Sequence, residues 1–491
     1  MDRIRHPPFP LLSKGEKGDT NDSKIQKLRD MKTIKLLIAI AVVVLTACQV
    51  NEYGDMSDIV DKWNEVKPQP IDTLVFQHPC ALYTQADFDR VSRSLEMGSA
   101  PAVVQQEFQA LKDCRYTNGD FGKVSHATIE IVRGDPKGTK AGSENFATAM
   151  RDAAAAYQFG LLWNLTKDEQ YAERGVFILN DWTNICEQVT ANDPNQYLAA
   201  GAQGFTFALA GELLRSYEGW AEEEQVAYRQ WMLDVFAEKN LDFLKRHCST
   251  TCGAGHYWSN WDLVNLCSYF QIGILTEDKT IIEYVCNYFL RSGDSNGNLA
   301  RLMTAEHKDP LGTGEILYQM QESGRDQGHA TMALAVVTQL CQAAKALYSF
   351  NPNVTDLDFY GARSNAVLHG AEYIALTNLR QGSKNDNTDG AWLINVDQIP
   401  FTTVGPWCKG GDNHEAAHEH TAFSSEGRGT ARPNWEMLVA HYGKQLGQPC
   451  LYTETFAKKL RPECGAGDER YGFNSGAFDQ VGWSTLMLYQ E

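Results

Sequence analysis

The sequence lacks a long apolar segment near its start, an excess of basic residues and a regular cysteine pattern. The apolar run at 36–45 has ten residues, fewer than the roughly 20 that a transmembrane helix needs. The formal net charge of −18 argues against nucleic acid or an anionic membrane surface as a partner. The twelve cysteines follow no regular spacing and define no disulfide framework, so buried free thiols or one local disulfide are expected.

The sequence also has little that predicts β-sheet. No sustained alternation of apolar and polar residues separates its helical segments, and no exact repeat is visible. Helical periodicity starts near Leu82, with Thr84 as the expected N-cap. Helices are predicted at 147–165, 171–182, 205–214, 263–274, 281–290, 330–347, 363–376 and 435–442, and loops at 117–143, 292–314, 351–358 and 381–429. This pattern predicts an all-α fold, an (α/α) toroid or incomplete barrel of helical hairpins.

The start of the chain has the order of an export signal. A basic segment at 31–35 precedes the apolar run, and Leu-Thr-Ala then leads to Cys48. This ending resembles a bacterial lipobox, so Cys48 is the expected lipidated first residue of the mature protein. The expected organisation is a non-native extension at 1–30, a lipoprotein signal peptide at 31–47, a tether at 48–75 and one domain at 76–491.

Export and lipidation have two expected consequences. The protein should be lipid-anchored to the bacterial outer membrane or reside in the periplasm, and it should touch the membrane only through its lipid. Removal of 1–47 takes away nine Lys or Arg and five Asp or Glu, which changes the net charge from −18 to −22. An anionic substrate then has to be held by a local group of Arg and His side chains.

The densest polar segment of the chain is 321–329. Its nine residues hold two carboxylates, a guanidinium, an imidazole and two amides, and a long apolar run follows. Such polar density beside a buried helix is costly unless the groups pair or face a cleft. An acid, a base and a fixed cation in one cleft suit catalysis. The alternative is a helix N-terminus at which Glu322 and Asp326 complement the dipole while Arg325 is solvated.

A second dense segment lies at 255–262. His256 and Asn260 are four residues apart and would share one face of a helix. Trp258 and Trp261 beside them suit a sugar-binding platform, because aromatic faces stack on pyranose rings. The alternative is an aromatic core patch with a hydrogen-bonded histidine.

Three further patterns leave alternatives open. Tyr373 lies on an otherwise apolar helix face and either packs in the core or lines a cleft. His414 and His418 match the H-E-x-x-H pattern of zinc peptidases, but no apolar stripe backs them. Cys248, with a cysteine and His256 at intervals of four residues after it, lacks the second close pair of a structural zinc site.

Four motifs in order resemble the alginate-lyase-domain superfamily of polysaccharide lyases. They are Q-E-S-G-R-D-Q-G-H at 321–329, G-x-E-Y-x-x-x-x-N-L at 370–379, H-x-x-x-N-W-D-L at 256–263 and R-G-x-x-R-P-x-W-E at 428–436. The resemblance spans about 78–442. It implies an (α/α) toroid and β-elimination of uronate polymers such as alginate. The chain departs from some relatives at Gly255, where they have Asn, at Ala366, where they have Arg, and at Thr377, where they have Tyr.

The reaction of a uronate lyase assigns a chemical role to several polar residues of these motifs. The proton beside a carboxylate is weakly acidic until that carboxylate is neutralised, which we expect Arg325 to do, with Glu322 orienting it or sharing a proton. We expect His329 to be the base and Tyr373 the acid. His256 should bind the carboxylate with Asn260, and His256 as the base remains open.

The remaining expectations concern binding. Substrate-binding residues are expected to be Asn260, Trp258, Trp261 and Gln321, together with His420 and Arg432, which the resemblance adds. The expected partner is an anionic polysaccharide, and the reaction requires no metal or other cofactor. Two alternatives stay open, a non-catalytic glycan-binding lipoprotein and a zinc metallopeptidase that uses His414 and His418.

Overall fold

A computed structural model of the chain describes residues 71–118, 121–249, 253–291, 295–406, 419–471 and 479–491. Contacts divide the chain into two units, 1–52 and 53–491, and every described residue belongs to the second. The predicted signal peptide with Cys48, and also Cys252, His414 and His418, lie outside the described residues.

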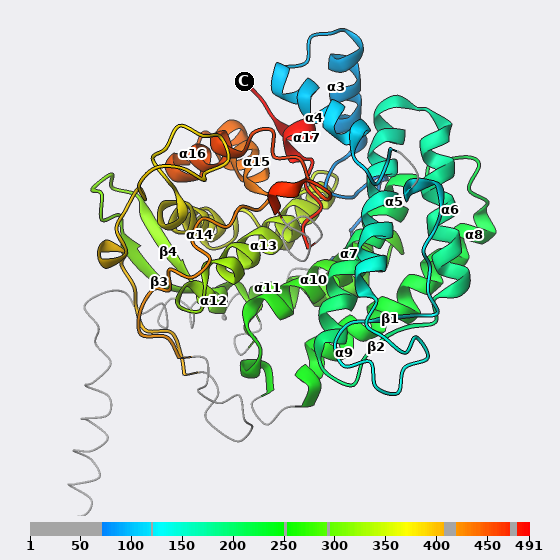
Figure 1. Ribbon diagram of the computed structural model, residues 1–491, viewed down its shortest axis with the longest axis horizontal. Coiled ribbons are helices and arrows are strands. Elements are labelled where there is room, and N and C mark those ends of the chain that lie inside the picture. Colours follow the sequence, from blue (N-terminus) through cyan, green and yellow to red (C-terminus); the bar gives the residue numbers. More distant parts are fainter. Residues whose placement is uncertain (1–70, 119–120, 250–252, 292–294, 407–418, 472–478) are drawn as a thin grey trace, which may run out of the picture. The chain divides into compact units, whose positions relative to one another are not determined.

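The unit is built mainly of helices that pack in pairs (Figure 1). Four long helices contact one another in chain order: α5 (Phe146–Thr166), α7 (Asn195–Leu214), α10 (Ser259–Leu275) and α13 (Gln327–Tyr348). Their neighbours are α6 (Glu169–Ile185), α8 (Glu222–Met232), α9 (Glu238–Arg246), α11 (Lys279–Arg291) and α14 (Ala362–Asn378). The prediction of an all-α (α/α) toroid of helical hairpins is confirmed.

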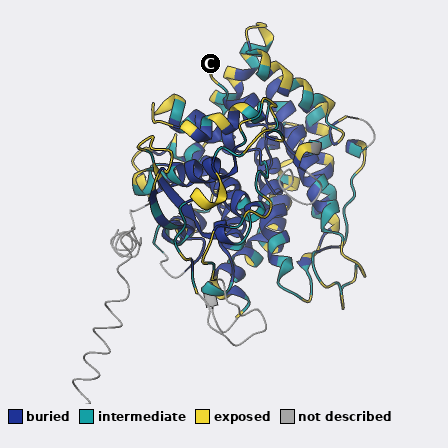
Figure 2. Cartoon of the chain, turned by 60° about the vertical axis from the view of Figure 1, so that its left-hand side comes forward, coloured by how far each residue is buried: buried dark blue, intermediate teal, exposed yellow. Residues whose placement is uncertain are grey.

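Helices α7 and α10 are buried on nearly all sides, whereas α6 and α11 bury one face. Figure 2 shows buried residues through the interior and exposed ones on the outer elements. Small residues allow this packing. A Cβ on Gly201 of α7 would lie 2.7 Å from Val264 Cγ2 of α10, so glycine lets the two backbones approach. By length and composition α13 resembles a membrane span, but 89% of its apolar window is buried, which identifies it as a core helix.

Among the described residues, five further helices lie toward the two ends of the chain. They are α3 (Gln85–Glu96), α4 (Ala102–Asp113), α15 (Trp435–Leu438), α16 (Leu451–Leu460) and α17 (Ser484–Leu488). The predicted cap of α3 is present, because the Asp87 carboxylate accepts hydrogen bonds from the backbone N–H and the hydroxyl of Thr84, each at 3.0 Å. Helices α3 and α4 pack against α17, which joins the two ends of the described chain.

Two small sheets interrupt the helices. Strand β1 (Glu130–Val132) pairs in parallel with β2 (Gln188–Thr190), and β3 (Met303–Lys308) pairs antiparallel with β4 (Ile316–Met320). The prediction of a loop throughout 292–314 is therefore wrong at β3 and also at α12 (Leu299–Leu302). Burial alternates along β3, but six residues give a period-2 signal too short to stand out. The β3–β4 hairpin leads directly into the dense segment that follows Met320.

Buried carboxylates fasten α4 to the C-terminal part of the unit. The carboxylate of Glu107 accepts hydrogen bonds from the backbone N–H groups of Cys464 and Leu486. The carboxylate of Glu463 accepts one from Ser484 Oγ at 2.7 Å. Burial raises the pKa of Glu107 to about 7, and burial together with a neighbouring carboxylate raises the pKa of Glu463 to about 8.

These carboxyls should make the fold less stable at higher pH. Each binds a proton more tightly in the folded than in the unfolded chain, so stability falls as pH rises from the ordinary value near 4.5 toward 8. We expect the midpoint temperature of thermal unfolding to decrease as the pH is raised from 5 to 8. In Glu463→Gln this decrease should be smaller than in the parent. A variant with the parent's full pH dependence would contradict this assignment.

Candidate active site

The dense segment folds into one polar cluster at the start of α13. After β4, the short helix η5 (Gln321–Gly324) turns the chain, and α13 begins beyond it. Asp326 caps α13, because its Oδ1 accepts the backbone N–H of His329 at 2.8 Å. Glu322, Arg325, Asp326 and His329 are called the η5–α13 cluster below.

Glu322 is the buried anchor of the cluster. Its Oε1 accepts hydrogen bonds from Ser259 Oγ at 3.0 Å and from Asn260 N at 3.2 Å. Its Oε2 accepts from Asn260 Nδ2 at 3.3 Å and from Arg325 Nη1 at 3.0 Å. Because the carboxylate has no exposed surface, this geometry fits the role of orienting Arg325 better than that of sharing a proton with a substrate.

The two amide side chains expected to bind substrate instead form hydrogen bonds between η5 and the start of α10. Gln321 Oε1 accepts the backbone N–H of Ser259 at 2.8 Å, and Gln321 Nε2 donates to Arg301 O at 3.2 Å. Asn260 holds Glu322 as described, and both amide residues are buried. They therefore fix η5 against the start of α10, where backbone N–H groups also favour an adjacent carboxylate.

Asp326 links the cation and the imidazole of the cluster. His329 Nδ1 lies 2.6 Å from Asp326 Oδ2, and Arg325 Nε lies 3.7 Å from the same oxygen. Burial acts to raise the pKa of Asp326, but the hydrogen bonds from His329 outweigh it and hold that pKa below its ordinary value. With Nδ1–H donated to the carboxylate, a neutral His329 presents Nε2 as a proton acceptor, and 41% of the side chain is exposed.

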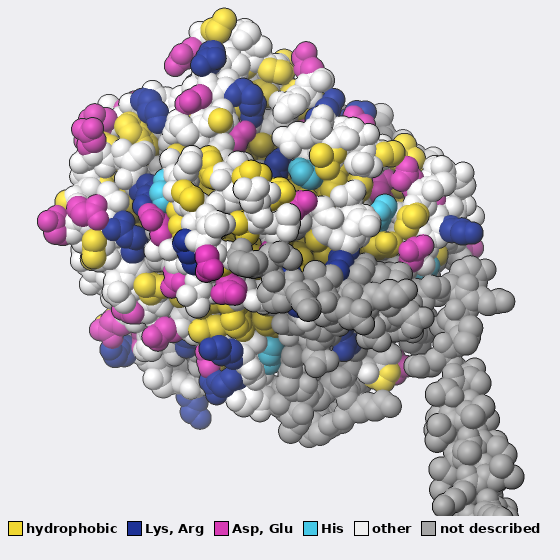
Figure 3. Space-filling model, turned by 180° about the vertical axis from the view of Figure 1, so that it is seen from behind, with side chains coloured by type: hydrophobic (Ala, Val, Ile, Leu, Met, Phe, Trp, Pro, Cys, Tyr) yellow, Lys and Arg dark blue, Asp and Glu magenta, His cyan; other side chains and the backbone are white. Residues whose placement is uncertain are grey.

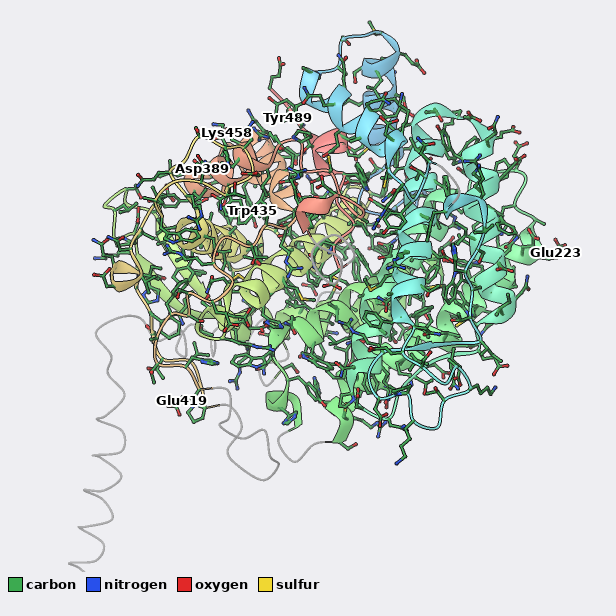
Figure 4. The ribbon with its side chains drawn as sticks, viewed as in Figure 1. Glu223, Asp389, Glu419, Trp435, Lys458 and Tyr489 are labelled. Atoms are coloured by element: carbon green, nitrogen blue, oxygen red, sulfur yellow. The ribbon has the colours of Figure 1, made fainter. Side chains whose placement is uncertain are left out.

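Aromatic rings lie beside Arg325. The ring of His420 stacks on Trp258 with centroids 5.3 Å apart, and the Arg325 guanidinium lies 5.6 Å from the same indole. Burial, and then the charge of Arg325, lower the pKa of His420 below its ordinary value. Glu419, labelled in Figure 4, directly precedes His420. A Cβ on Gly324 would lie 2.4 Å from His420 Cβ, so glycine permits this contact.

Two of the expected site residues lie in the core. The Tyr373 hydroxyl donates to Pro400 O at 3.0 Å, the residue has no exposed surface, and burial raises its pKa. The buried guanidinium of Arg432 donates to Gly328 O at 3.0 Å and to Gln480 Oε1 at 3.0 Å. Arg432 therefore supports the first turn of α13, and neither side chain is placed to touch a polymer.

Two others lie just before and at the start of α10. His256 ends the short helix η4 (Gly253–His256), and its ring centroid is 4.8 Å from that of Tyr257. Trp261 packs against Tyr257 and Phe243, with ring centroids 4.9 Å and 6.0 Å away. Trp261 is thus part of an aromatic group, while His256 stays partly exposed.

The part of the chain that the structure describes holds no group of three or more His, Cys, Asp or Glu side chains arranged for a metal. The nine described cysteines are free thiols, and most of them are buried. Cys252 and the H-E-x-x-H pattern lie outside this part, so the alternatives that involve them stay predictions.

Two residues that the site uses were not among the predicted site residues, although Asp326 was expected as an acid at a helix N-terminus. Asp326 positions His329, and its signal was an aspartate three residues before a histidine at a predicted helix start. Ser259 donates to Glu322, and no signal in either segment indicated that the two would meet.

Comparisons with solved structures find similar folds at low identity. Alginate lyase A1-III from Sphingomonas species A1 is 11% identical, over 87% of this chain and 100% of that chain, with a TM-score of 0.50. A variant of alginate lyase A1-III complexed with tetrasaccharide is 12% identical over 87% and 99%, with a TM-score of 0.47. An alginate lyase from Bacteroides ovatus is 11% identical over 61% and 83%, with a TM-score of 0.39. No curated protein matches.

A family model matches a continuous range that includes the candidate site. The alginate lyase family model matches residues 109–371, which is more than half of the chain. The matched range begins in α4, includes η4, the start of α10 and the whole η5–α13 cluster, and ends in α14. The chain belongs to the alginate lyase family.

Proposed function

We propose that the protein is a polysaccharide lyase that cleaves a uronate-containing polymer, alginate or a related polyuronate, by β-elimination. The observation that carries the proposal is the shared oxygen of Asp326, which holds Arg325 and His329 beside each other. A uronate presents a carboxylate and the acidic C–H on neighbouring atoms. A cation and a proton acceptor side by side match that pair.

The reaction follows from these positions. Arg325 neutralises the substrate carboxylate, which makes the proton on the adjacent carbon, C5, easier to remove. Nε2 of His329 takes that proton, and the electron pair of the C–H bond forms the C4–C5 double bond. The bond from C4 to the glycosidic oxygen breaks, and this oxygen leaves with a proton supplied by an acid.

The geometry changes the expected identity of the acid that protonates the leaving oxygen. Tyr373 has its hydroxyl committed to Pro400 O in the core. After the first step His329 carries the abstracted proton on Nε2, so we assign it as the donor to the leaving oxygen. His256, partly exposed at the end of η4, remains the alternative for either proton transfer.

A panel of polyuronates tests the proposal against a non-catalytic glycan-binding protein. Purified protein is incubated separately with polymers of mannuronate, guluronate and glucuronate, and the absorbance of the unsaturated uronate product is followed. We expect at least one polymer to give the absorbance and new reducing ends. Binding of a polymer without either signal would favour the glycan-binding alternative.

Removal of metal separates a lyase from a zinc peptidase. His414 and His418 stand among glycines and polar residues, without the apolar stripe that normally backs the zinc helix. We expect treatment with a chelator followed by dialysis to leave the uronate-lyase rate within about twofold. A rate that disappears and returns only with added Zn²⁺ would show that the chemistry proposed for Arg325 and His329 is incomplete.

We also propose that the protein is anchored through a lipid on Cys48, on the strength of the signal-like order at 31–47. Replacing Cys48 by alanine should release the protein from the membrane fraction or leave it unprocessed. Fractionation and mass spectrometry of the mature N-terminus measure this. An unmodified Cys48 in a fully soluble wild-type protein would contradict it.

A further inference from the structure

Two arginine side chains contact one tryptophan close to the η5–α13 cluster. The guanidinium carbon of Arg380 lies 3.7 Å from the ring centroid of Trp392, and that of Arg428 lies 4.3 Å from it. Arg380 and Trp392 are partners in an antiparallel bridge, which places their side chains on the same side of the backbone pair. We call these three residues the arginine pair and its tryptophan.

Neither arginine has an acidic partner among the described residues. Arg428 donates from Nε to Thr377 O and from Nη2 to Ile394 O, the latter at 2.7 Å, while its buried Nη1 has no partner. Burial, and then the charge of Arg380, lower the pKa of Arg428 to about 10. On the face shown in Figure 3 carboxylates lie among the basic side chains, and the chain as a whole carries a net charge of −18.

Hydrogen bonds attach the pair to the first turn of α13. Gln327 N donates to Glu426 O at 2.7 Å, and Asn378 Nδ2 donates to Gln327 Oε1 at 2.9 Å. Asn378 Oδ1 in turn accepts the backbone N–H of Gly429 at 2.8 Å. The end of α14 and the loop after 425 therefore meet α13 at the end that carries His329.

A purely structural role explains the position of Arg428 but not that of Arg380. By donating to Thr377 O and Ile394 O, Arg428 fixes the last turn of α14, as a cation at a helix C-terminus does. Arg380 makes one such bond, from Nη1 to Gly390 O at 3.0 Å, and keeps the rest of its guanidinium available. Two cations held on one ring repel each other, and a bound anion would remove that cost.

We propose that Arg380, with Arg428 behind it, binds the carboxylate of a second uronate residue of the polymer, outside the residue that is cleaved. The inference rests on the proposed function and extends it to substrate length. Recognition is by charge, because the two guanidinium groups already cover Trp392. A guanidinium can hold a carboxylate through two parallel hydrogen bonds, which favours a uronate over a neutral sugar at this position.

The test compares Arg380→Gln with the parent on uronate oligomers of increasing length. We expect KM for long oligomers to rise about tenfold, in line with the loss of a charge-assisted hydrogen bond, while kcat stays near the parent value. The shortest cleavable oligomers, which do not reach the second position, should show no difference. Arg380→Lys keeps the charge, so its KM for long oligomers should lie between those of the parent and Arg380→Gln. Arg229→Gln on α8 is the matched control for loss of a surface arginine.

Calorimetry with a polyuronate gives a readout that does not depend on turnover. It is performed in the His329→Ala background, where adding Arg380→Gln should weaken binding about tenfold and reduce its dependence on salt. If the wild-type enzyme cleaves a polyuronate and Arg380→Gln changes neither KM nor affinity at any length, the inference is wrong and the proposed function stands. If the wild type neither binds nor cleaves any polyuronate, both fail.

Discussion

Replacing His329 by alanine should lower turnover on the preferred polyuronate by about 10²–10⁴-fold, the usual contribution of a general base. The side chain is partly exposed, so the fold should be retained, which circular dichroism and thermal unfolding check. The matched variant is Asp326→Asn, which keeps the shape of the Asp326 side chain but no longer fixes Nδ1–H of His329. It should lower kcat more than it changes KM, because it affects the tautomer of the base and not its presence.

Two outcomes would reassign the proton transfers. If His329→Ala keeps near-native turnover while His256→Ala abolishes it, the base lies in η4. Tyr373→Phe removes one buried hydroxyl, and we expect a much smaller effect than that of His329→Ala because the hydroxyl donates to Pro400 O. A loss of comparable size would restore Tyr373 as the acid and would require the core around it to open during the reaction.

Replacing Arg325 by alanine should reduce turnover at least as much as loss of a single oxyanion-stabilising donor, which costs on the order of 10²–10³-fold. The substrate carboxylate would then keep its charge and make the enolate-like intermediate less stable. The variant also leaves the buried carboxylate of Glu322 without its cation, so a lower unfolding midpoint is expected.

Arg325→Lys separates the chemical effect from the structural one. A lysine keeps a positive charge near Glu322 but cannot reproduce the planar contacts to Glu322 and Asp326. We expect its stability to lie close to that of the parent and its turnover to lie between those of the parent and Arg325→Ala. Equal turnover in all three proteins, measured under saturating substrate, would exclude Arg325 from the reaction.

The sequence predicted the helices well where an apolar helical pattern repeats over several turns. Helices α5, α10 and α13 each exceed fifteen residues, so their apolar residues repeat over several turns. Helices α8 and α9 were missed although both are amphipathic, because they are short and rich in charged residues. The β3–β4 hairpin was missed for the same reason, since five or six residues give too few alternations.

The site could be located from the sequence but not resolved in detail. The polar density of 321–329 predicted groups that either pair or face a cleft, and the structure shows pairing together with partial exposure of the cation and the imidazole. Glu322 and Gln321 pair with the start of α10, about sixty residues earlier in the chain, while Arg325 and His329 remain partly exposed. Spacing within a segment does not reveal a partner in another segment, so Asn260 was expected to meet substrate.

The most direct measurement for the central claim is cleavage of the preferred polyuronate in water enriched in heavy oxygen. The elimination proposed for Arg325 and His329 breaks the bond without adding water, so the products should absorb as unsaturated uronates and carry no label from the solvent at the cleaved bond. His329→Ala and Arg325→Ala should slow the formation of that product in parallel. Saturated products that contain one labelled oxygen per cleavage would show hydrolysis, and would contradict the proposed function of the η5–α13 cluster.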